Sequence, residues 1–188
     1  MPTKIGMVSL GCPKNQVDAE MLLYTLREAG YELSEDPALA DAVIINTCGF
    51  IESAKQEAIE ETMEYIALKK EGRIKKIILT GCLAERYREE IREEMPEVDA
   101  VVGIGANKDI VSVVEKVMHD GKCCRFGEKC ELPLEGGRIL STLPFYAYLK
   151  IAEGCDNRCS YCAIPNIRGP FRSRPWKTCW RRPRAWPP

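Results

Sequence analysis

The stretch Ala42-Val43-Ile44-Ile45-Asn46 stands directly ahead of Thr47-Cys48-Gly49. Such a short apolar, β-branched run that ends at turn residues is typical of a β-strand. Similar runs occupy residues 5–10 (IGMVSL) and 76–80 (KIILT), and a fourth occupies residues 100–103 (AVVG). The sequence therefore predicts at least four short strands in the first part of the chain.

Each run is followed by a longer amphipathic stretch, and the helices that we expect there span residues 15–29, 52–70, 84–94 and 107–119. Asn15 is a candidate N-cap for the first helix and Gly30 its C-terminal stop. Ser53 opens a candidate capping box for the second helix. The alternation of strand and helix from residue 4 to about residue 121 predicts an α/β domain with a parallel sheet.

The chain has 188 residues, of which 45% are hydrophobic and 29% charged, with a formal net charge of -1. This composition is typical of a globular protein, and binding to nucleic acid would need a local basic patch. The opening MPTKIGMVSLGC has no charged-then-apolar leader, and no apolar run approaches the roughly 18 residues of a membrane span. We therefore expect a cytoplasmic protein with no membrane partner, whose ten cysteines are metal ligands or reactive thiols.

Changes of composition divide the chain into four parts. Residues 1–122 make up the expected α/β domain. Residues 123–143 show no clear period, so we expect a linker there, with room for a hairpin. An apolar run at residues 146–151 predicts a strand that begins a second domain over residues 144–175.

Three cysteines recur at strand ends: Cys12, Cys48 and Cys82, each beside a glycine. The carboxyl ends of parallel strands lie along one edge of a sheet, where ligands gather around the switch in strand order. The neighbouring glycines allow tight turns and free backbone amides. Three ordinary buried cysteines are the simpler alternative. The repeated combination of strand end, cysteine and glycine favours a three-thiolate iron–sulfur cluster with one open iron.

Cys155, Cys159 and Cys162 form a second set with the spacing CxxxCxxC. Three thiolates cannot complete a cluster that needs four ligands, so one iron stays open. Catalytic metal sites keep such an open position for the molecule that they transform, which makes this set a candidate reaction centre. A zinc site is the alternative, but the spacing lacks the paired CxxC halves of zinc ribbons, and the only histidine, His119, is more simply a surface cap at a helix end.

The segment Lys150-Ile151-Ala152-Glu153-Gly154-Cys155, continuing to Cys162-Ala163-Ile164-Pro165 with Tyr161 before the last cysteine, resembles the cluster loop of radical S-adenosylmethionine enzymes. The resemblance implies a 4Fe-4S cluster on this second set, whose open iron chelates the amino and carboxylate groups of S-adenosylmethionine. It also implies cleavage of that cofactor to a 5'-deoxyadenosyl radical, and a second domain that is the start of a partial TIM barrel.

A three-cysteine α/β domain ahead of such a loop is the layout of methylthiotransferases. This resemblance implies a second 4Fe-4S cluster, on Cys12, Cys48 and Cys82, that carries or supplies the sulfur inserted into a C–H bond. Such an insertion needs a hydrogen-atom abstractor that no side chain supplies, so a cofactor must carry it. The implied cofactors are two 4Fe-4S clusters and S-adenosyl-L-methionine, and an electron donor is an implied partner.

The motif Ser9-Leu10-Gly11-Cys12-Pro13-Lys14-Asn15 followed by Val17-Asp18 resembles the branch that modifies an aspartate of the small-subunit ribosomal protein uS12. Residues 164–169 and 172–174 fit that branch as well. The transfer RNA branch usually shows Gln after that cysteine and Met before the Asn. Two alternatives stay open: a transfer RNA adenosine methylthiotransferase and, from another class, a non-catalytic iron–sulfur protein.

Arg168, Arg172 and Arg174 follow the cluster loop and, with Tyr161, are candidate contacts for the cofactor or the substrate. For the arginines, salt bridges at the barrel edge are the alternative.

Cys123, Cys124 and Cys130 lie in the expected linker with no strand ahead of them. We expect them not to be ligands of either cluster, and an accessory metal or redox role stays open. The mixed charges of residues 69–71 and 85–90 predict a solvated helix face without a further function.

All three tryptophans lie in the aberrant tail, residues 176–188, among prolines and basic residues. This composition predicts neither a strand nor a stable helix. Codons for residues 176–180, taken one base earlier, encode an amphipathic helix start, so we hypothesise a one-base deletion or sequencing error here. Only the first strand and loop of a barrel precede the tail, so we expect the 188-residue product to be inactive alone.

Overall fold

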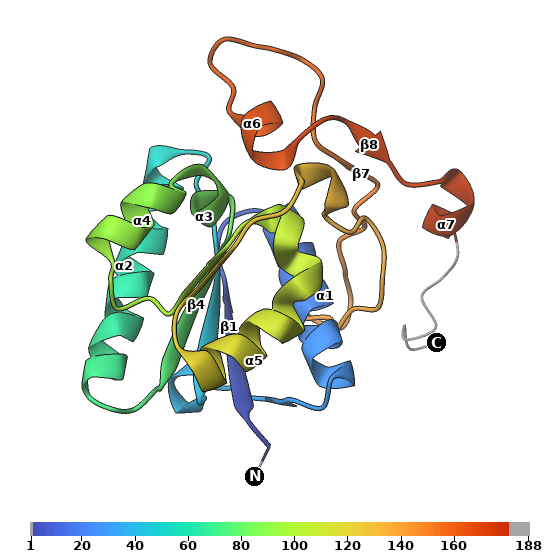
Figure 1. The fold of residues 1–188 in the computed structure, drawn as a ribbon. Coiled ribbons are helices and arrows are strands. Elements are labelled where there is room, and N and C mark those ends of the chain that lie inside the picture. Colours follow the sequence, from blue (N-terminus) through green and yellow to red (C-terminus); the bar gives the residue numbers. More distant parts are fainter. Residues whose placement is uncertain (1, 181–188) are drawn as a thin grey trace.

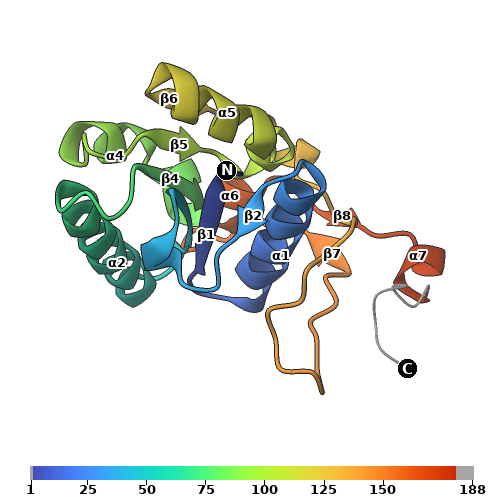
Figure 2. The same cartoon turned by 90° about the horizontal axis from the view of Figure 1, so that it is seen from below.

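The computed structural model describes residues 2–180 and contains a six-stranded parallel sheet with the order β2-β1-β3-β4-β5-β6. Helices lie on both faces of this sheet (Figures 1 and 2), so the predicted α/β class is confirmed. The strands of the sheet are β1 (Lys4–Ser9), β2 (Glu32–Leu33), β3 (Ala42–Thr47), β4 (Lys76–Gly81), β5 (Ala100–Val102) and β6 (Cys123–Arg125). An antiparallel pair, β7 (Ala152–Glu153) and β8 (Arg172–Ser173), stands apart from it.

The helices are α1 (Pro13–Glu28), α2 (Glu52–Lys70), α3 (Cys82–Arg86), α4 (Arg88–Glu94), α5 (Ile110–Asp120), α6 (Ile164–Arg168) and α7 (Trp176–Trp180). Short 3-10 helices occupy Pro37–Leu39, Ile104–Asp109 and Lys129–Glu131.

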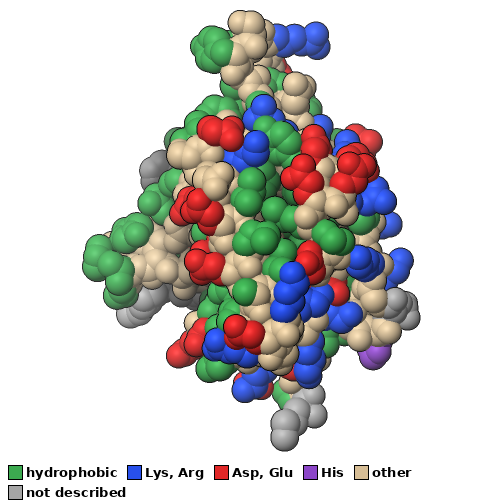
Figure 3. Space-filling view, turned by 90° about the vertical axis from the view of Figure 1, so that its left-hand side faces the viewer, with side chains coloured by type: hydrophobic (Ala, Val, Ile, Leu, Met, Phe, Trp, Pro, Cys, Tyr) green, Lys and Arg blue, Asp and Glu red, His purple; other side chains and the backbone are tan. Residues whose placement is uncertain are grey.

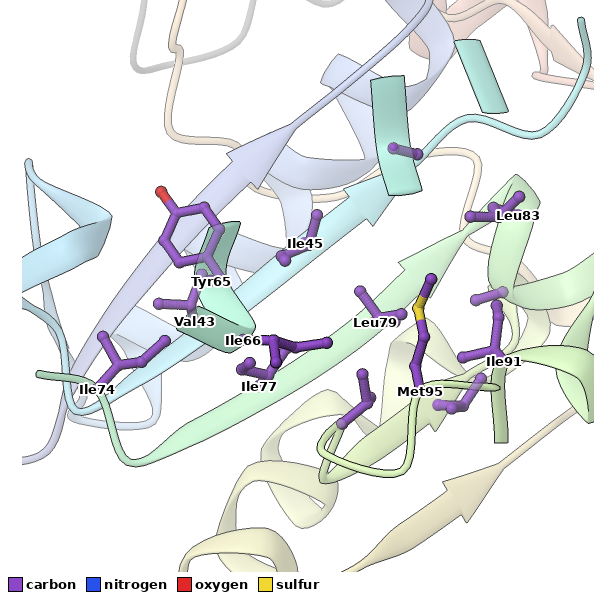
Figure 4. Packing of buried hydrophobic residues seen from close by; sticks show 14 of the residues in the cluster. Val43, Ile45, Tyr65, Ile66, Ile74, Ile77, Leu79, Leu83, Ile91 and Met95 are labelled. Atoms are coloured by element: carbon purple, nitrogen blue, oxygen red, sulfur yellow. The ribbon is translucent and has the colours of Figure 1, made fainter. Parts of the chain in front are cut away.

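One face of the sheet packs against α2, α3 and α4. Val43 and Ile45 of β3 and Leu79 of β4 point to this face and are fully buried against Tyr65 and Ile66 of α2 (Figure 4). Burial of each such aliphatic side chain contributes about 1.5–3 kcal/mol. On the outer side of this layer, basic side chains are interspersed with acidic ones (Figure 3).

The opposite face packs against α1 and α5 (Figure 2). Ile44 of β3 and Ile78 of β4 alternate with the residues of the first face and lie against Leu22 and Leu26 of α1 and Val114 of α5. Because successive side chains of a strand point to opposite faces, two helical layers bury the apolar runs of the central strands completely.

The order of the strands reverses between β1 and β3. After β1 the chain forms β2 on one side of it, and then returns to form β3 on the other side. In doubly wound sheets the carboxyl ends of the two strands at such a switch point form the ligand crevice. Cys12 and Cys48 follow these two strands, and Cys82 follows the next strand, β4.

The segment after residue 150 crosses this edge of the sheet. In Figure 1 it passes above the carboxyl ends of the strands, with β7, β8 and α6 over that edge. Helix α6 packs against α3, which begins at Cys82. The second cysteine set is therefore carried by a segment that is docked on the end of the sheet where the first set lies.

The two predicted N-caps, Asn15 and the capping box at Ser53, are both wrong. The predicted helix stop at Gly30 is confirmed by its φ of 91°. Helix α1 begins after Cys12 because Pro13 occupies its first turn, which places Asn15 inside the helix. Helix α2 begins after Ile51, and no side chain caps either helix.

The helix predicted over residues 84–94 is divided at Tyr87, whose backbone (φ -121°, ψ 40°) is not helical. Its first part extends back to Cys82 as α3, and the second part is α4. The prediction of a solvated helix face over residues 85–90 is wrong at Glu85. This side chain is buried and accepts a hydrogen bond from the backbone N–H of Ile104 (3.1 Å).

The predicted linker begins too early, because Cys123–Arg125 pairs with β5 as the edge strand β6. The strand predicted over residues 146–151 is also wrong, and only Ala152–Glu153 pairs, with β8. The prediction that the tail forms no helix is wrong for Trp176–Trp180, which forms α7. The Pro175 carbonyl accepts hydrogen bonds from the N–H groups of Thr178 (2.9 Å) and Cys179 (3.4 Å). The rest of the tail, residues 181–188, lies outside the described residues.

Among the helices of residues 2–180, none combines the length and the apolar composition that crossing a bilayer requires.

Candidate metal centres

The first cysteine set lies in three turns at the carboxyl edge of the sheet. Cys12 precedes the first residue of α1, Cys48 follows β3, and Cys82 is the first residue of α3. Cys12 is exposed, whereas Cys48 and Cys82 are buried, with 6% and 5% of their surface exposed. The set is thus open to solvent on the Cys12 side and enclosed by protein on the other.

Glycines allow the three turns to approach one another. Gly11 has φ 90°, and a Cβ placed on it would lie 2.4 Å from Cys48 Cβ and 2.9 Å from Cys48 Sγ. Gly81, before Cys82, has φ 95°, and a Cβ there would lie 2.3 Å from the carbonyl oxygen of Thr47. A side chain at either position would collide with the neighbouring turn, so glycine is required for this close approach.

Asn15 is fully buried in the middle of these turns. Its Nδ2 donates hydrogen bonds to the carbonyl oxygens of Leu10 (3.1 Å) and Thr47 (2.8 Å). Its Oδ1 accepts hydrogen bonds from the Cys82 thiol (3.5 Å) and from Arg168 Nη2. The residue that the sequence suggested as a helix cap is therefore a tertiary bridge.

Arg168 lies in a buried network of charges between α1 and the second cysteine segment. Its Nη1 contacts Asp18 Oδ2 at 2.6 Å and Glu153 Oε2 at 3.1 Å. Lys150 pairs with the same two carboxylates. All four side chains are at most 3% exposed, so each charge depends on the others for its compensation.

The charges of this network shift the pKa values of Cys82 and Glu153. Burial raises the pKa of the Cys82 thiol to about 11, although the charge of Arg168 offsets part of this effect. Burial alone would also raise the pKa of Glu153, but Arg168, Lys150 and Lys14 together hold it below its usual value. A metal that bound the thiolate would add positive charge beside Cys82, where Arg168 alone does not outweigh the effect of burial.

The second cysteine set lines an open cavity of about 720 Å³. The backbone N–H of Cys155 donates to the Gly169 carbonyl (3.1 Å), which anchors the start of the loop on the end of α6. The N–H of Cys162 donates to the Cys159 carbonyl (3.1 Å), so these two cysteines share one turn. Cys159 is exposed, and Cys155 and Cys162 are half-buried.

The donor groups that the two predicted sets offer are cysteine thiols. All ten cysteines lie within the described residues and are free thiols. Within residues 2–180, no three Cys, His, Asp or Glu side chains are close enough together to hold one metal ion. A single zinc ion needs its ligand atoms about 2.3 Å away, whereas a four-iron cluster spreads its thiolates farther apart. Cluster binding by either set stays a prediction.

The remaining candidate residues lie in different surroundings. Tyr161 is 90% exposed next to the second set. Arg172 donates to the carbonyl oxygens of Lys129, Cys130 and Leu132, and Arg174 pairs with Glu135 at 3.4 Å. Arg174, like Arg168, makes the salt bridge that was the alternative to cofactor binding, whereas Arg172 contacts backbone carbonyls only. A role for them, or for Arg168, in contacting cofactor or substrate stays a prediction.

The three cysteines of the expected linker are not brought together at either set. Cys123 and Cys124 lie in β6, and Cys130 lines a separate cavity of about 770 Å³ beside α6. His119 is exposed in the last turn of α5.

Asp18, Lys150 and Glu153 were not predicted from the sequence to be members of a buried network. Lys150 and Glu153 are charged residues beside apolar ones, ahead of the cysteine loop. Charges in such a stretch are the signal from which their burial could have been predicted.

Comparison with known proteins places this arrangement in a family. Residues 4–103 match the model of a family described as "Uncharacterized protein family UPF0004", which is more than half of the chain. The chain belongs to this family. The matched segment runs from β1 to the end of β5 and includes the first cysteine set, with the turns and strand ends that carry it.

Curated relatives are similar over a longer stretch. The chain is 50% identical to "Ribosomal protein uS12 methylthiotransferase RimO" of Pelotomaculum thermopropionicum over 93% of its length, and 51% identical to the protein of the same name from Desulforamulus reducens, also over 93%. These matches cover 39% and 40% of the two relatives. The chain therefore spans about two fifths of the length of the curated relatives it matches.

Proposed function

We propose that this chain provides the sulfur-delivering domain and the S-adenosylmethionine cluster loop of a radical methylthiotransferase that acts on an aspartate of ribosomal protein uS12. In this proposal the α/β domain covers the residues predicted for it, 1–122, together with the edge strand β6 (Cys123–Arg125), and residues 144–175 form the start of the radical domain. The observation that carries it is the placement of two three-cysteine sets at one edge of the sheet, linked by the Arg168 network. The names of the similar relatives support the substrate.

In this proposal Cys12, Cys48 and Cys82 hold one 4Fe-4S cluster. Cys155, Cys159 and Cys162 hold the other, next to the open cavity. When bound, the second cluster would supply the electron that cleaves S-adenosylmethionine, and the first would carry the sulfur.

The side chains of this chain have two tasks. The buried Cys48 and Cys82 close the inner side of the first site against water, whereas the exposed Cys12 leaves the outer side open. The open cavity at the second set leaves room for the cofactor and the target side chain, which must meet at short distance for hydrogen abstraction. Free thiols are consistent with a cytoplasmic enzyme that takes electrons from a separate donor protein.

The test combines two measurements on the protein expressed from the full reading frame around residues 1–188, reconstituted with iron and sulfide and reduced without oxygen. We expect 5'-deoxyadenosine from S-adenosylmethionine, and a uS12 peptide heavier by one methylthio group. The matched control carries Cys159→Ala, which should abolish both products. Absence of 5'-deoxyadenosine from the unsubstituted protein would contradict the enzyme proposal and leave a non-catalytic iron–sulfur protein.

The same reaction mixture separates the two substrate classes. Transfer RNA added beside uS12 should remain unmodified. A methylthio-adenosine in the nucleoside digest, with unchanged uS12, would replace the ribosomal substrate by transfer RNA. Sequencing of the DNA around codon 176 tests the frameshift hypothesis separately.

A further inference from the structure

The amide of Asn15 uses its whole hydrogen-bonding capacity on tertiary partners. An asparagine amide offers two N–H donors and two acceptor lone pairs. Both donors are occupied by the carbonyl oxygens of Leu10 and Thr47, and the oxygen accepts from Cys82 and Arg168. A fully occupied, fully buried amide fixes the relative positions of its four partners, because moving any one of them leaves a buried polar group unpaired.

The four partners belong to the parts of the chain that carry the candidate ligands. Leu10 lies two residues before Cys12, and Thr47 lies immediately before Cys48. The third partner, in the metal-free chain, is the Cys82 thiol itself, which gives up its proton and this hydrogen bond when it binds iron, while the contacts of Asn15 with Leu10, Thr47 and Arg168 do not depend on that proton. One side chain thus connects all three turns of the first cysteine set.

The fourth partner comes from the other cysteine segment. Arg168 ends α6, and the carbonyl of the next residue, Gly169, holds the N–H of Cys155. Arg168 is 2% exposed and is held on α1 by Asp18 and on its own segment by Glu153. If this segment left the sheet edge, Asn15 would lose a hydrogen bond and Cys82 would lose its neighbouring positive charge.

We propose that Asn15 and Arg168 are a pair of positioning residues that holds the three strand-end cysteines ready for a cluster only while the segment of Cys155, Cys159 and Cys162 is docked. The inference rests on the proposed function in one respect, which is that both cysteine sets bind clusters. It adds that occupancy of the first site depends on the docking of the second segment, so that the first cluster is held stably only where the radical-generating loop is in place.

The first experiment measures iron affinity at the first set. The whole chain carries Cys155→Ala, Cys159→Ala and Cys162→Ala, so that only the strand-end cysteines can bind a cluster after anaerobic reconstitution. We expect Asn15→Ala to lower iron affinity about tenfold or more, as is typical when a residue that orients metal ligands is removed. Arg168→Gln should have a similar effect, although it lies more than 80 residues from these ligands in sequence.

Two control variants match the loss of a buried polar group. Asn107 is 5% exposed, and its Oδ1 accepts a hydrogen bond from the Thr80 hydroxyl (2.9 Å). Asn107→Ala therefore removes a buried amide that contacts neither cysteine set. Arg138 docks its segment on α1 through Glu20, so Arg138→Gln removes a similar ion pair away from Cys82. Both controls should retain the iron affinity of the parent. Comparable losses of iron in the controls and in the paired variants would overturn the proposal.

A second readout needs no iron. In the metal-free chain, Asn15→Ala and Arg168→Gln should both accelerate amide hydrogen exchange in residues 10–12 and 47–49, while the middle of α2 exchanges as in the unsubstituted chain. The controls should leave both regions unchanged. If the paired variants exchange like the controls, Asn15 and Arg168 are not a positioning pair.

The two readouts separate this inference from the proposed function. If the unsubstituted chain takes up no iron at either set, the proposed function fails, and the exchange measurement still decides whether the pair holds the turns. If iron binds but the paired variants bind it as the parent does, only the positioning inference fails.

Discussion

Gly81 shows how the backbone shapes the edge of the sheet where Cys12, Cys48 and Cys82 lie. Its φ is 95°, and a Cβ at this position would lie 2.3 Å from the Thr47 carbonyl oxygen, which leaves no room for a side chain. We predict that Gly81→Ala destabilises the protein by about 2–4 kcal/mol, from backbone strain together with the clash. The matched control is Gly30→Ala, where φ is 91° but no atom lies within 4 Å, and the cost should be about 1 kcal/mol. Urea unfolding measures both, and equal losses would contradict the clash.

Asp99, ahead of β5, is a buried acceptor for groups of α2 and β4. It is 7% exposed, accepts a hydrogen bond from the Ile77 N–H (2.8 Å) and pairs with Lys69 and with Lys76. Asp99→Ala leaves Lys69 and the Ile77 N–H without this acceptor, so we expect a loss of about 2–4 kcal/mol in unfolding free energy. Asp99→Asn keeps an acceptor for Ile77 and should lose less. A loss below about 1 kcal/mol for the alanine variant would show that water replaces the carboxylate.

Single residues also show what sequence could and could not predict about the site. The strand-end position of Cys12, Cys48 and Cys82 follows from local patterns, because strands and turns are coded locally. The role of Asn15 does not, because its partners Thr47 and Arg168 are 32 and 153 residues away. Its local sequence favours a helix cap, and the tertiary contacts prevail over that preference.

Asp41 connects three neighbouring strands through hydrogen bonds that its carboxylate accepts. The backbone N–H of Lys4 in β1 (2.9 Å) and the ammonium of Lys75, ahead of β4 (2.7 Å), lower the pKa of the Asp41 carboxyl at the entrance to β3. A lowered pKa means that the ionised form favours the folded state. Its contribution is present above the unfolded pKa of about 3.9 and is lost as the pH falls through the folded value.

We therefore predict that Asp41→Asn costs about 0.5–1 kcal/mol at pH 7, a modest value because solvent screens this partly exposed pair. The difference between the two proteins should shrink toward zero as the pH falls below about 3. Urea unfolding at a series of pH values measures it. A difference that is independent of pH would assign the effect to the hydrogen-bond geometry alone.

The elements that sequence predicted well are the buried ones. Strands β1, β3, β4 and β5 lie within a residue or two of their expected positions, because long apolar runs have few alternatives. The misassigned segments have weak local patterns. Cys123–Arg125 becomes a strand only because the edge of β5 is free to pair with it. Residues 146–151 contain exposed Tyr146, Leu149 and Ile151, and the structure pairs only the two residues that follow them.

The rule that parallel strands end at one edge predicted that Cys12, Cys48 and Cys82 meet there. The strand order provides that edge, and a shared cluster on the three cysteines stays a prediction. The docking of the second cysteine segment on the same edge was not predictable. It depends on Asp18, Glu153, Lys150 and Arg168, whose charges compensate one another only in three dimensions.

We propose that the chain holds two separate iron–sulfur clusters. The most direct test of this proposal is the iron content and Mössbauer spectrum of the anaerobically reconstituted chain, compared with two variants in which all three cysteines of one set are replaced by alanine. We predict about eight iron atoms per unsubstituted chain and about four in each triple variant, all with the spectrum of 4Fe-4S clusters. Iron that is unchanged by either triple substitution, or zinc bound in its place, would contradict the claim.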